Sequence, residues 1–216
     1  MSSFPQHLLE GYRTFTSQRL PTEQSRYREL SERGQSPEVM VIGCCDSRVS
    51  PEVIFDAGPG ELFVVRNVAN LVPVYQPDGG AHGVSAALEY AVQVLHVKHI
   101  VVLGHAQCGG IRAFIDNSAP LSPGDFVGKW MSMFIKPGEK VAQRDHETMQ
   151  DFTTRIEKAA VFRSLENLMT FPCVQILAER GRLHLHGAYF GVAEGSLSVL
   201  DQAAKEFRSV REQAGE

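Results

Sequence analysis

Cysteine is scarce in this sequence, with four residues in a chain of 216. Small domains that depend on disulfides carry a much higher density of cysteine, so the composition excludes a disulfide scaffold. Each cysteine is therefore a candidate for a buried thiol, a metal ligand or a nucleophile. Its position along the chain has to decide among these roles.

Long apolar runs are missing as well. No stretch approaches the roughly 18 consecutive apolar residues that a membrane span needs. The first residues, Met1 to His7, contain neither the basic nor the apolar region of a secretory signal. We therefore expect no membrane partner and a cytoplasmic location, in which cysteines stay reduced.

An excess of positive charge is also lacking, because 21 Lys and Arg residues face 25 Asp and Glu residues, for a net charge of −4. A nucleic-acid-binding protein concentrates Lys and Arg on one face, so we expect no nucleic-acid partner. The hydrophobic fraction of 43% and the charged fraction of 21% are ordinary for a globular chain. These values exclude the disordered and fibrous classes.

The centre of the chain alternates between short apolar runs and helical patterns. Runs rich in Val and Ile, typical of buried strands, lie at 39–42, 62–65 and 100–103. A mostly apolar helix is predicted over 81–97, and Ser50-Pro51-Glu52 has the residue types that begin a helix. This alternation predicts an α/β fold with a mostly parallel central β-sheet, covered by helices on both faces.

The N-terminal region predicts a helical arm. Residues 5–33 place apolar side chains among many charged ones, with a break near Pro21. We expect this half-polar arm to pack on a partner subunit. No segment has the composition of a linker, so we expect a single domain over 1–216, with the arm at 1–34, the core at 35–200 and a C-terminal helix or tail at 201–216.

The second half of the chain predicts helices followed by a strand pair. Residues 126–169 have a helical pattern that is interrupted at Pro137-Gly138. Residues 183–190 alternate in the manner of a strand. We expect 197–200 to pair with that strand through a turn at Glu194-Gly195.

Two polar segments follow predicted strands, at 43–48 and 104–110. Ligand sites of open α/β sheets gather at the carboxyl ends of the strands, so these segments are expected to converge. Together they offer Cys44, His105 and Cys108, and thiolate with imidazole suits zinc. Adjacent side chains of an extended backbone point to opposite faces, which disfavours Cys45 as a further ligand. Three protein ligands leave one position for water, as in catalytic rather than structural zinc sites.

Other polar residues have two possible interpretations. Asp46 and Arg48 often form no more than a solvated salt bridge at this spacing. Beside zinc, Arg48 can hold the carboxylate by two parallel hydrogen bonds, and Asp46 can then orient a zinc-bound solvent molecule. His184 and His186 share one face of a predicted strand and could bind metal, but such residues are more often edge or interface positions.

The two polar segments resemble those of the β-class carbonic anhydrases: Cys-x-Asp-Ser-Arg at 44–48 and His-x-x-Cys-Gly-Gly at 105–110. The resemblance extends from about 35 to 199. It implies reversible hydration of carbon dioxide to bicarbonate and a proton by zinc-bound hydroxide. It also implies at least a homodimer, often a larger even-numbered homo-oligomer, with the pocket at the interface. The residues that it implies are the zinc ligands Cys44, His105 and Cys108 and the catalytic pair Asp46 and Arg48.

Members of this family have either an open metal site or one that the aspartate can close. The closed type often has a bicarbonate site with Trp three residues before the first cysteine, where this chain has Val41, although Arg66 matches another part of that site. The open, plant-like type has Gln nine residues before that cysteine, and Gln35 stands there. The resemblance therefore implies the open type, with Gln35 donating a hydrogen bond to substrate. The implied substrate pocket consists of Phe63, Val68, Tyr90 and Gly109.

Two alternatives stay open at this point. Carbon disulfide and carbonyl sulfide are linear like carbon dioxide, so a hydrolase of either compound fits the same zinc site. A structural zinc protein or a redox sensor without turnover predicts four protein ligands, or a Cys44–Cys108 disulfide in air. The presence of Asp46, Arg48 and Gln35 argues against this second alternative.

Overall fold

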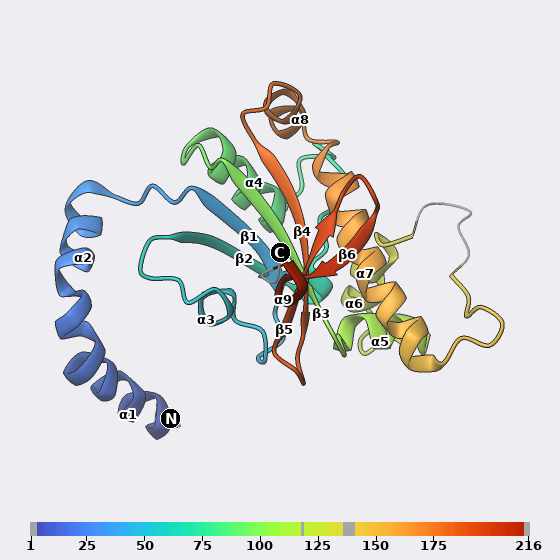
Figure 1. The fold of residues 1–216 in the computed structure, drawn as a ribbon, viewed down its shortest axis with the longest axis horizontal. Coiled ribbons are helices and arrows are strands. Elements are labelled where there is room, and N and C mark those ends of the chain that lie inside the picture. The colour runs from blue at the N-terminus through green and yellow to red at the C-terminus, as the bar shows by residue number, and fades with distance from the viewer. Residues whose placement is uncertain (1–3, 118, 136–140, 214–216) are drawn as a thin grey trace.

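The computed structural model describes residues 4–117, 119–135 and 141–213 (Figure 1). A six-stranded sheet forms its centre, in the order β2-β1-β3-β4-β5-β6. The first four strands of that order pair in parallel, and the last two pairs are antiparallel. The predicted α/β fold with a mostly parallel sheet is confirmed. The strands are β1 (Val39–Cys44), β2 (Leu62–Asn67), β3 (His99–His105), β4 (His184–Gly191), β5 (Ser196–Asp201) and β6 (Glu206–Ser209).

The strand pair at the C-terminal end is confirmed, because β4 and β5 are antiparallel neighbours. The expectation of a helix or tail over 201–216 is wrong in part. Residues Glu206–Ser209 form the edge strand β6, and the described chain ends with the short helix α9 (Val210–Gln213). Phe207 anchors this strand, since its ring packs edge-on against Phe162 at 5.7 Å and Tyr189 at 6.2 Å between ring centroids. One aromatic residue in four is too weak a pattern to predict this strand from the sequence.

Helices α4 (Gly83–Gln93), α7 (Met149–Leu168) and α8 (Pro172–Glu179) cover one face of the sheet (Figure 1). The strand residues beneath them, such as Ile42 and Ile100, are fully buried. Gly104 allows α7 to approach β3 closely, because a Cβ at that position would lie 2.6 Å from a methyl group of Val161. Burial of these apolar side chains is the main driving force for this layer.

The opposite face is only partly covered within the described chain. Val41 and Leu103 are buried there, but Val39, Val64 and Val101 remain partly exposed. The helix that packs on this apolar cluster is the short α3 (Pro51–Ile54). The prediction of helices on both faces therefore holds fully for one face only. A continuous apolar run predicts that both faces of a strand are apolar. It does not identify the segment that covers each face.

Helix α3 begins after Ser50, as predicted, but Ser50 does not cap it. The hydroxyl of Ser50 donates to a carboxylate oxygen of Glu52 at 2.9 Å. The helical pattern over 126–169 divides into α6 (Phe126–Ser132) and α7, and the predicted interruption at 137–138 lies outside the described residues. Helix α5 (Gly109–Ile115) follows β3 directly.

The N-terminal arm extends away from the sheet, as the blue ribbon of Figure 1 shows. It consists of α1 (Gln6–Thr14), a π-helical turn (Phe15–Arg19) and α2 (Leu20–Arg33), and none of these elements contains a buried residue. The predicted break near Pro21 is wrong, because the backbone stays helical throughout. The wider π turn lies directly before Pro21, where the chain cannot supply an N–H donor.

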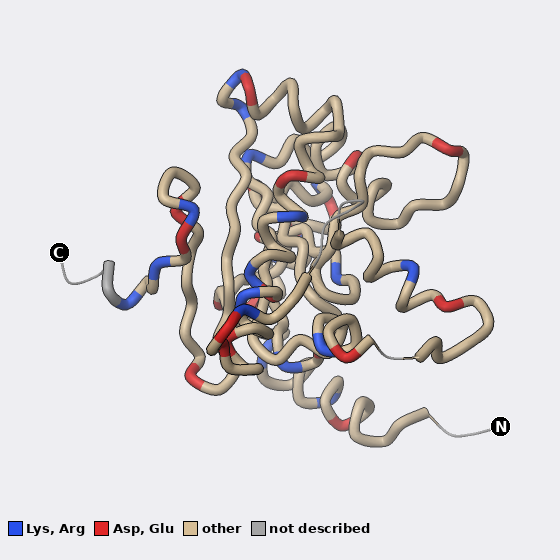
Figure 2. The backbone as a smooth tube through the Cα atoms, turned by 90° about the vertical axis from the view of Figure 1, so that its right-hand side faces the viewer, with Lys and Arg blue, Asp and Glu red and all other residues tan. Residues whose placement is uncertain are grey.

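Charged residues of both signs are interspersed along the backbone (Figure 2). Among the helices of the described residues, none combines the length and the apolar character of a membrane span.

Candidate active site

Cys44, His105 and Cys108 lie together at the carboxyl ends of the neighbouring parallel strands β1 and β3, as predicted. Their potential ligand atoms lie within 4.8 Å of one another, and all three residues are buried. The two sulfurs are 4.0 Å apart. Two sulfurs that each bind a tetrahedral zinc ion at about 2.3 Å lie about 3.8 Å from each other, so the spacing fits zinc.

His105 presents one specific nitrogen to this group. Its Nδ1 lies 2.9 Å from the carbonyl oxygen of Ala106 and donates to it. Its Nε2 is buried and has no hydrogen-bond partner in the described structure. A buried acceptor without a donor is costly, unless a cation binds it. Two sulfurs and this nitrogen are the donor set that zinc prefers.

The two thiols influence each other strongly. The hydrogen bond from Cys108, with a further contribution from His105, lowers the pKa of Cys44 to about 4. The pKa of Cys108 is raised, because its thiol donates a hydrogen bond to Cys44, the site is buried, and a second negative charge beside the Cys44 thiolate is unfavourable. A divalent cation between the sulfurs favours the thiolate form of both.

Asp46 and Arg48 form the bidentate pair that the sequence predicts. Arg48 donates from Nε to Oδ1 at 2.9 Å and from Nη2 to Oδ2 at 2.7 Å, and its backbone N–H also donates to Oδ1 at 3.0 Å. These bonds hold the pKa of Asp46 well below its usual range. Asp46 is therefore an ionised acceptor beside the metal group.

Arg48 also joins the two ligand-bearing segments. Its Nη2 donates to the carbonyl oxygen of Gln107 at 3.0 Å. Gln107 has a left-handed backbone with φ of 58°, which is uncommon outside glycine. The sequence analysis gave Gln107 no role, since a backbone carbonyl leaves no trace in residue type.

Arg66 holds the segment after β1 from the neighbouring strand β2. Its Nε donates to the carbonyl oxygen of Cys44 at 2.7 Å, and its Nη2 donates to that of Asp46 at 2.6 Å. The resemblance implied a match to a bicarbonate site for this residue. In this structure Arg66 directs two of its donors to the backbone instead, so it positions the turn that carries the ligand and the aspartate.

Glu157 on α7 is a residue of the site that the sequence analysis missed. One of its carboxylate oxygens accepts from the backbone N–H of Cys108 at 2.9 Å, and the other accepts from the hydroxyl of Tyr189 at 2.6 Å. Burial raises the pKa of Glu157, and the side chain is 3% exposed. A charged residue between Ile156 and Ala160 on the apolar side of a helix is the signal that could have identified it.

Two residues of the implied pocket, Val68 and Gly109, lie near the metal group. The indole N–H of Trp130 donates to the carbonyl oxygen of Val68 at 2.7 Å. A Cβ on Gly110 would lie 2.6 Å from a methyl group of Val68, whereas a Cβ on Gly109 would meet nothing within 4 Å. Gly110 is therefore the glycine that packing requires, and Gly109 borders open space.

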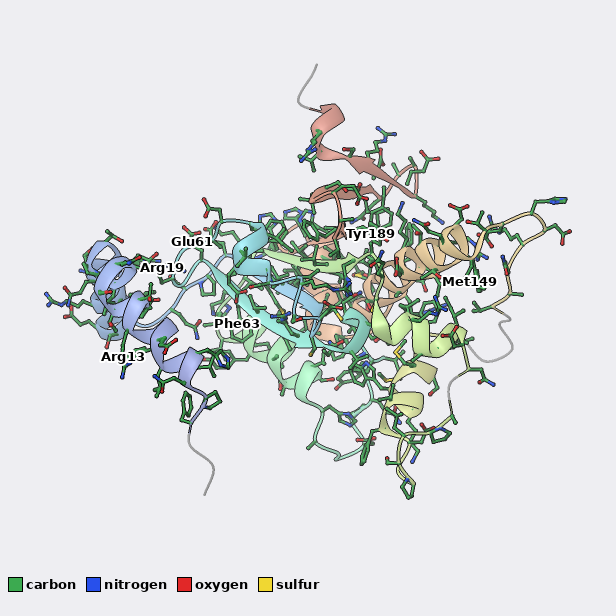
Figure 3. The ribbon with its side chains drawn as sticks, turned by 90° about the horizontal axis from the view of Figure 1, so that it is seen from below. Arg13, Arg19, Glu61, Phe63, Met149 and Tyr189 are labelled. Carbon is green, nitrogen blue, oxygen red and sulfur yellow. The ribbon has the colours of Figure 1, made fainter. Side chains whose placement is uncertain are left out.

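The structure does not bring Gln35, Phe63 and Tyr90 to the metal group of the same chain. Phe63 and Tyr90 contact each other, with ring centroids 5.9 Å apart, but Phe63 pairs with Met40, four residues before Cys44. At about 3.3 Å per residue this offset is about 13 Å. Gln35 is exposed and lies beyond the amino end of β1. Figure 3 shows Phe63 on the side of the sheet that faces the arm, far from Tyr189.

The remaining cysteines take no part in the metal group. Cys45 is exposed, as expected for a residue that points away from its neighbour Cys44, and Cys173 is half-buried against the main core.

Comparison with known proteins agrees with this geometry. A family model described as carbonic anhydrase matches residues 39–197. A carbonic anhydrase of Pseudomonas aeruginosa is 37% identical over 205 residues, which cover 95% of this chain and 91% of that protein. The solved structure of the β-carbonic anhydrase CcaA has a TM-score of 0.85 and 28% identity, covering 94% of this chain and 91% of that one. A structure from a study of two tetrameric β-carbonic anhydrases of Sordaria macrospora has a TM-score of 0.73 and 28% identity, with coverage of 91% and 96%. The chain belongs to the β-class carbonic anhydrases, and its cofactor is zinc.

Proposed function

We propose that this protein catalyses the reversible hydration of carbon dioxide to bicarbonate and a proton at an open zinc site. The observation that carries the proposal is the convergence of Cys44, His105 and Cys108 beside an Asp46 that Arg48 holds in place. Zinc bound there would lower the pKa of its water toward about 7, but less far than with three neutral imidazoles because two of the ligands are thiolates, and would so make a hydroxide nucleophile available.

Asp46 orients that nucleophile. A carboxylate offers about four lone-pair positions, and three of them accept from Arg48. The remaining position accepts a hydrogen bond from the attacking water and fixes which lone pair of the water faces the substrate. Because both oxygens of Asp46 are bound to Arg48, the geometry favours the open site over one that the aspartate closes.

Three residues of the proposed pocket come from a second copy of the chain. Gln35, Phe63 and Tyr90 lie near the edge strand β2, which is half-exposed along its whole length. Tyr90 is 44% exposed. In the proposed assembly, Phe63 and Tyr90 of one copy lie over the metal group of the other copy and supply the apolar lining for carbon dioxide. Gln35 of the same copy as Phe63 donates an amide hydrogen to a substrate oxygen.

The arm and the incompletely covered sheet face support the same assembly. Leu8 and Tyr12 of the arm are 51% and 64% exposed, so their own chain leaves much of these apolar side chains uncovered, although Tyr12 contacts the ring of Phe15. Packing of each arm on the other copy buries these side chains. We therefore propose a homodimer or a larger even-numbered homo-oligomer, and a cytoplasmic location that keeps the ligand thiols reduced.

Stopped-flow measurement of carbon dioxide hydration, combined with metal analysis, tests the proposal. We expect about one zinc ion per chain in the wild type, and loss of both zinc and activity in Cys108→Ala. Cys45→Ala is the matched control, because Cys45 is the exposed neighbour of a ligand, and it should keep both. Full zinc and full activity in Cys108→Ala would refute the proposed ligand set.

Parallel assays with carbon disulfide and carbonyl sulfide test the substrate. We expect hydration of carbon dioxide to be much faster than hydrolysis of either sulfur compound. A reversed order of rates would assign the same site to a hydrolase.

A further inference from the structure

A second group of histidines lies at the other end of the sheet from the zinc site. His99 is the first residue of β3, and His105 is its last. At about 3.3 Å per residue, the strand separates them by about 20 Å. In the parallel register, His99 pairs with His184 of β4, and Val101 pairs with His186. The imidazoles of residues 99, 184 and 186 therefore project from one face of the sheet.

The ring of His99 contacts both of the other rings. The rings of His99 and His184 stack, with centroids 5.3 Å apart and an interplanar angle of 26°. The centroids of His99 and His186 are 5.2 Å apart. The closest approach joins Nδ1 of His99 to Nε2 of His186 at 3.1 Å. Two ring nitrogens thus converge on one point, and a third imidazole lies beside them.

The spacing of these nitrogens matches a shared metal ion. Nitrogen ligands lie about 2.0–2.1 Å from zinc, so two ligands at a tetrahedral angle are about 3.3 Å apart. The observed 3.1 Å differs from that separation by a few tenths of an ångström. His184 is exposed, so its ring is free to rotate from the stacked position and direct a nitrogen to the same ion.

We propose that His99 and His186, with His184 as third ligand, form a second metal site for a divalent transition-metal ion such as Zn²⁺ or Ni²⁺. Imidazole nitrogen suits both ions, and water completes the coordination. The donor set has no sulfur, so the site binds more weakly than the catalytic centre. His184 is exposed, and His99 and His186 are half-buried, so solvent reaches this cluster.

Binding requires a shift of one proton. In the metal-free pair one nitrogen carries the hydrogen of the bond between His99 and His186. On metal binding this proton moves through solvent to the other nitrogen of the same ring, so both imidazoles stay neutral and each offers a lone pair. Burial and the two neighbouring imidazoles lower the pKa of His186, which keeps it neutral near pH 7. The nearby charges of Lys98 and Glu38 pair with each other.

Metal counting on the zinc-loaded protein tests the site. After equilibrium dialysis against excess Zn²⁺ at pH 7.5, we expect two zinc ions per wild-type chain and one in the His99→Ala/His186→Ala variant. Hydration of carbon dioxide by that variant should be unchanged. His7→Ala is the matched control, because it removes an exposed histidine of the arm, and it should keep both ions. One zinc per wild-type chain, or two in the double variant, would overturn the proposal.

Chemical protection tests the same site without any substitution. Diethyl pyrocarbonate modifies accessible imidazoles, and peptide mapping locates the modified residues. For protein that holds one zinc ion per chain, at the catalytic site, we expect Ni²⁺ to protect His99, His184 and His186 at least tenfold relative to His7. Equal modification with and without Ni²⁺ would exclude the site. Because the catalytic zinc is already bound, this result is independent of the proposed hydration of carbon dioxide.

Discussion

The metal end of the sheet and the β2 edge differ in how complete they are within one chain. At the metal end, Arg48, Arg66 and Glu157 each donate to or accept from specific partners around buried ligands. At the β2 edge, Phe63 and Tyr90 contact each other but remain partly exposed. Under the proposed function, this difference means that one chain supplies the metal chemistry and that a second copy completes the substrate pocket.

Removal of zinc should have the largest effect on activity, because the ion binds directly at the metal end of the sheet. Dialysis against a zinc chelator is expected to reduce carbon dioxide hydration to the uncatalysed rate and to lower the melting temperature, since a ligand that binds the folded state stabilises it. Readdition of zinc should restore both quantities. Activity that survives the loss of zinc would contradict the metal mechanism.

Substitution of the orienting carboxylate is the next largest test of the metal end. Asp46→Asn should retain zinc, because Asp46 is not among the proposed ligands, and should lower kcat by about 10- to 100-fold, as for other residues that act through a metal-bound group. Stopped-flow rates and zinc content on the same sample check this. Loss of zinc together with loss of rate would show that Asp46 is a ligand.

Complementation tests whether the metal group and the pocket residues Phe63 and Tyr90 of one active site come from different chains. Phe63→Ala/Tyr90→Ala should lower kcat/KM by about tenfold or more through the lost apolar contacts, with zinc retained. Mixing it with a Cys108→Ala chain, after dissociation and reassembly, should restore activity to about a quarter of the wild-type value, because half of the dimers are mixed and each has one intact site. No gain on mixing would place the whole pocket within one chain.

The smallest effect concerns an ion pair between Glu147, which precedes α7, and Arg155 in the first turns of that helix. The pKa of Glu147 is lowered to about 2 from an ordinary value of 4.5, chiefly by its hydrogen bond from Arg155. A carboxylate with a lowered folded-state pKa stabilises the fold above its unfolded pKa and loses this contribution as pH falls toward 2. Wild type should therefore exceed Glu147→Gln in stability at pH 6, and the difference should vanish near pH 2. Urea unfolding at several pH values measures it, and a constant difference would contradict the assignment.

The sequence predicts local patterns and chemical groups well, and pairing between distant segments poorly. The strands at 39–42, 62–65 and 100–103 are present because short runs of branched apolar residues need burial. The convergence of Cys44 with His105 and Cys108 follows from their places at the carboxyl ends of parallel strands. Glu157 was missed because its partners are a backbone N–H and a hydroxyl from β4, which no spacing reveals.

Some helices and strands were also predicted incorrectly from the sequence, for physical reasons. The arm stays helical past Pro21 because a π turn absorbs the missing donor, and such turns have no sequence signature of their own. Edge strand β6 depends on a tertiary contact of Phe207. Gln35, Phe63 and Tyr90 were assigned to an interface pocket by resemblance, but a single sequence does not say which chain supplies each residue.

The hydrogen bond from Arg48 to the carbonyl of Gln107 also bears on the order of events during maturation. Because Arg48 ties the segment after β1 to the segment after β3, the backbone carrying the ligands loses its conformational entropy when the chain folds, rather than when it captures the ion. Metal capture by such a preorganised site costs little rearrangement. Loss of this hydrogen bond would therefore leave more of the ligand-bearing backbone to be ordered by the ion itself.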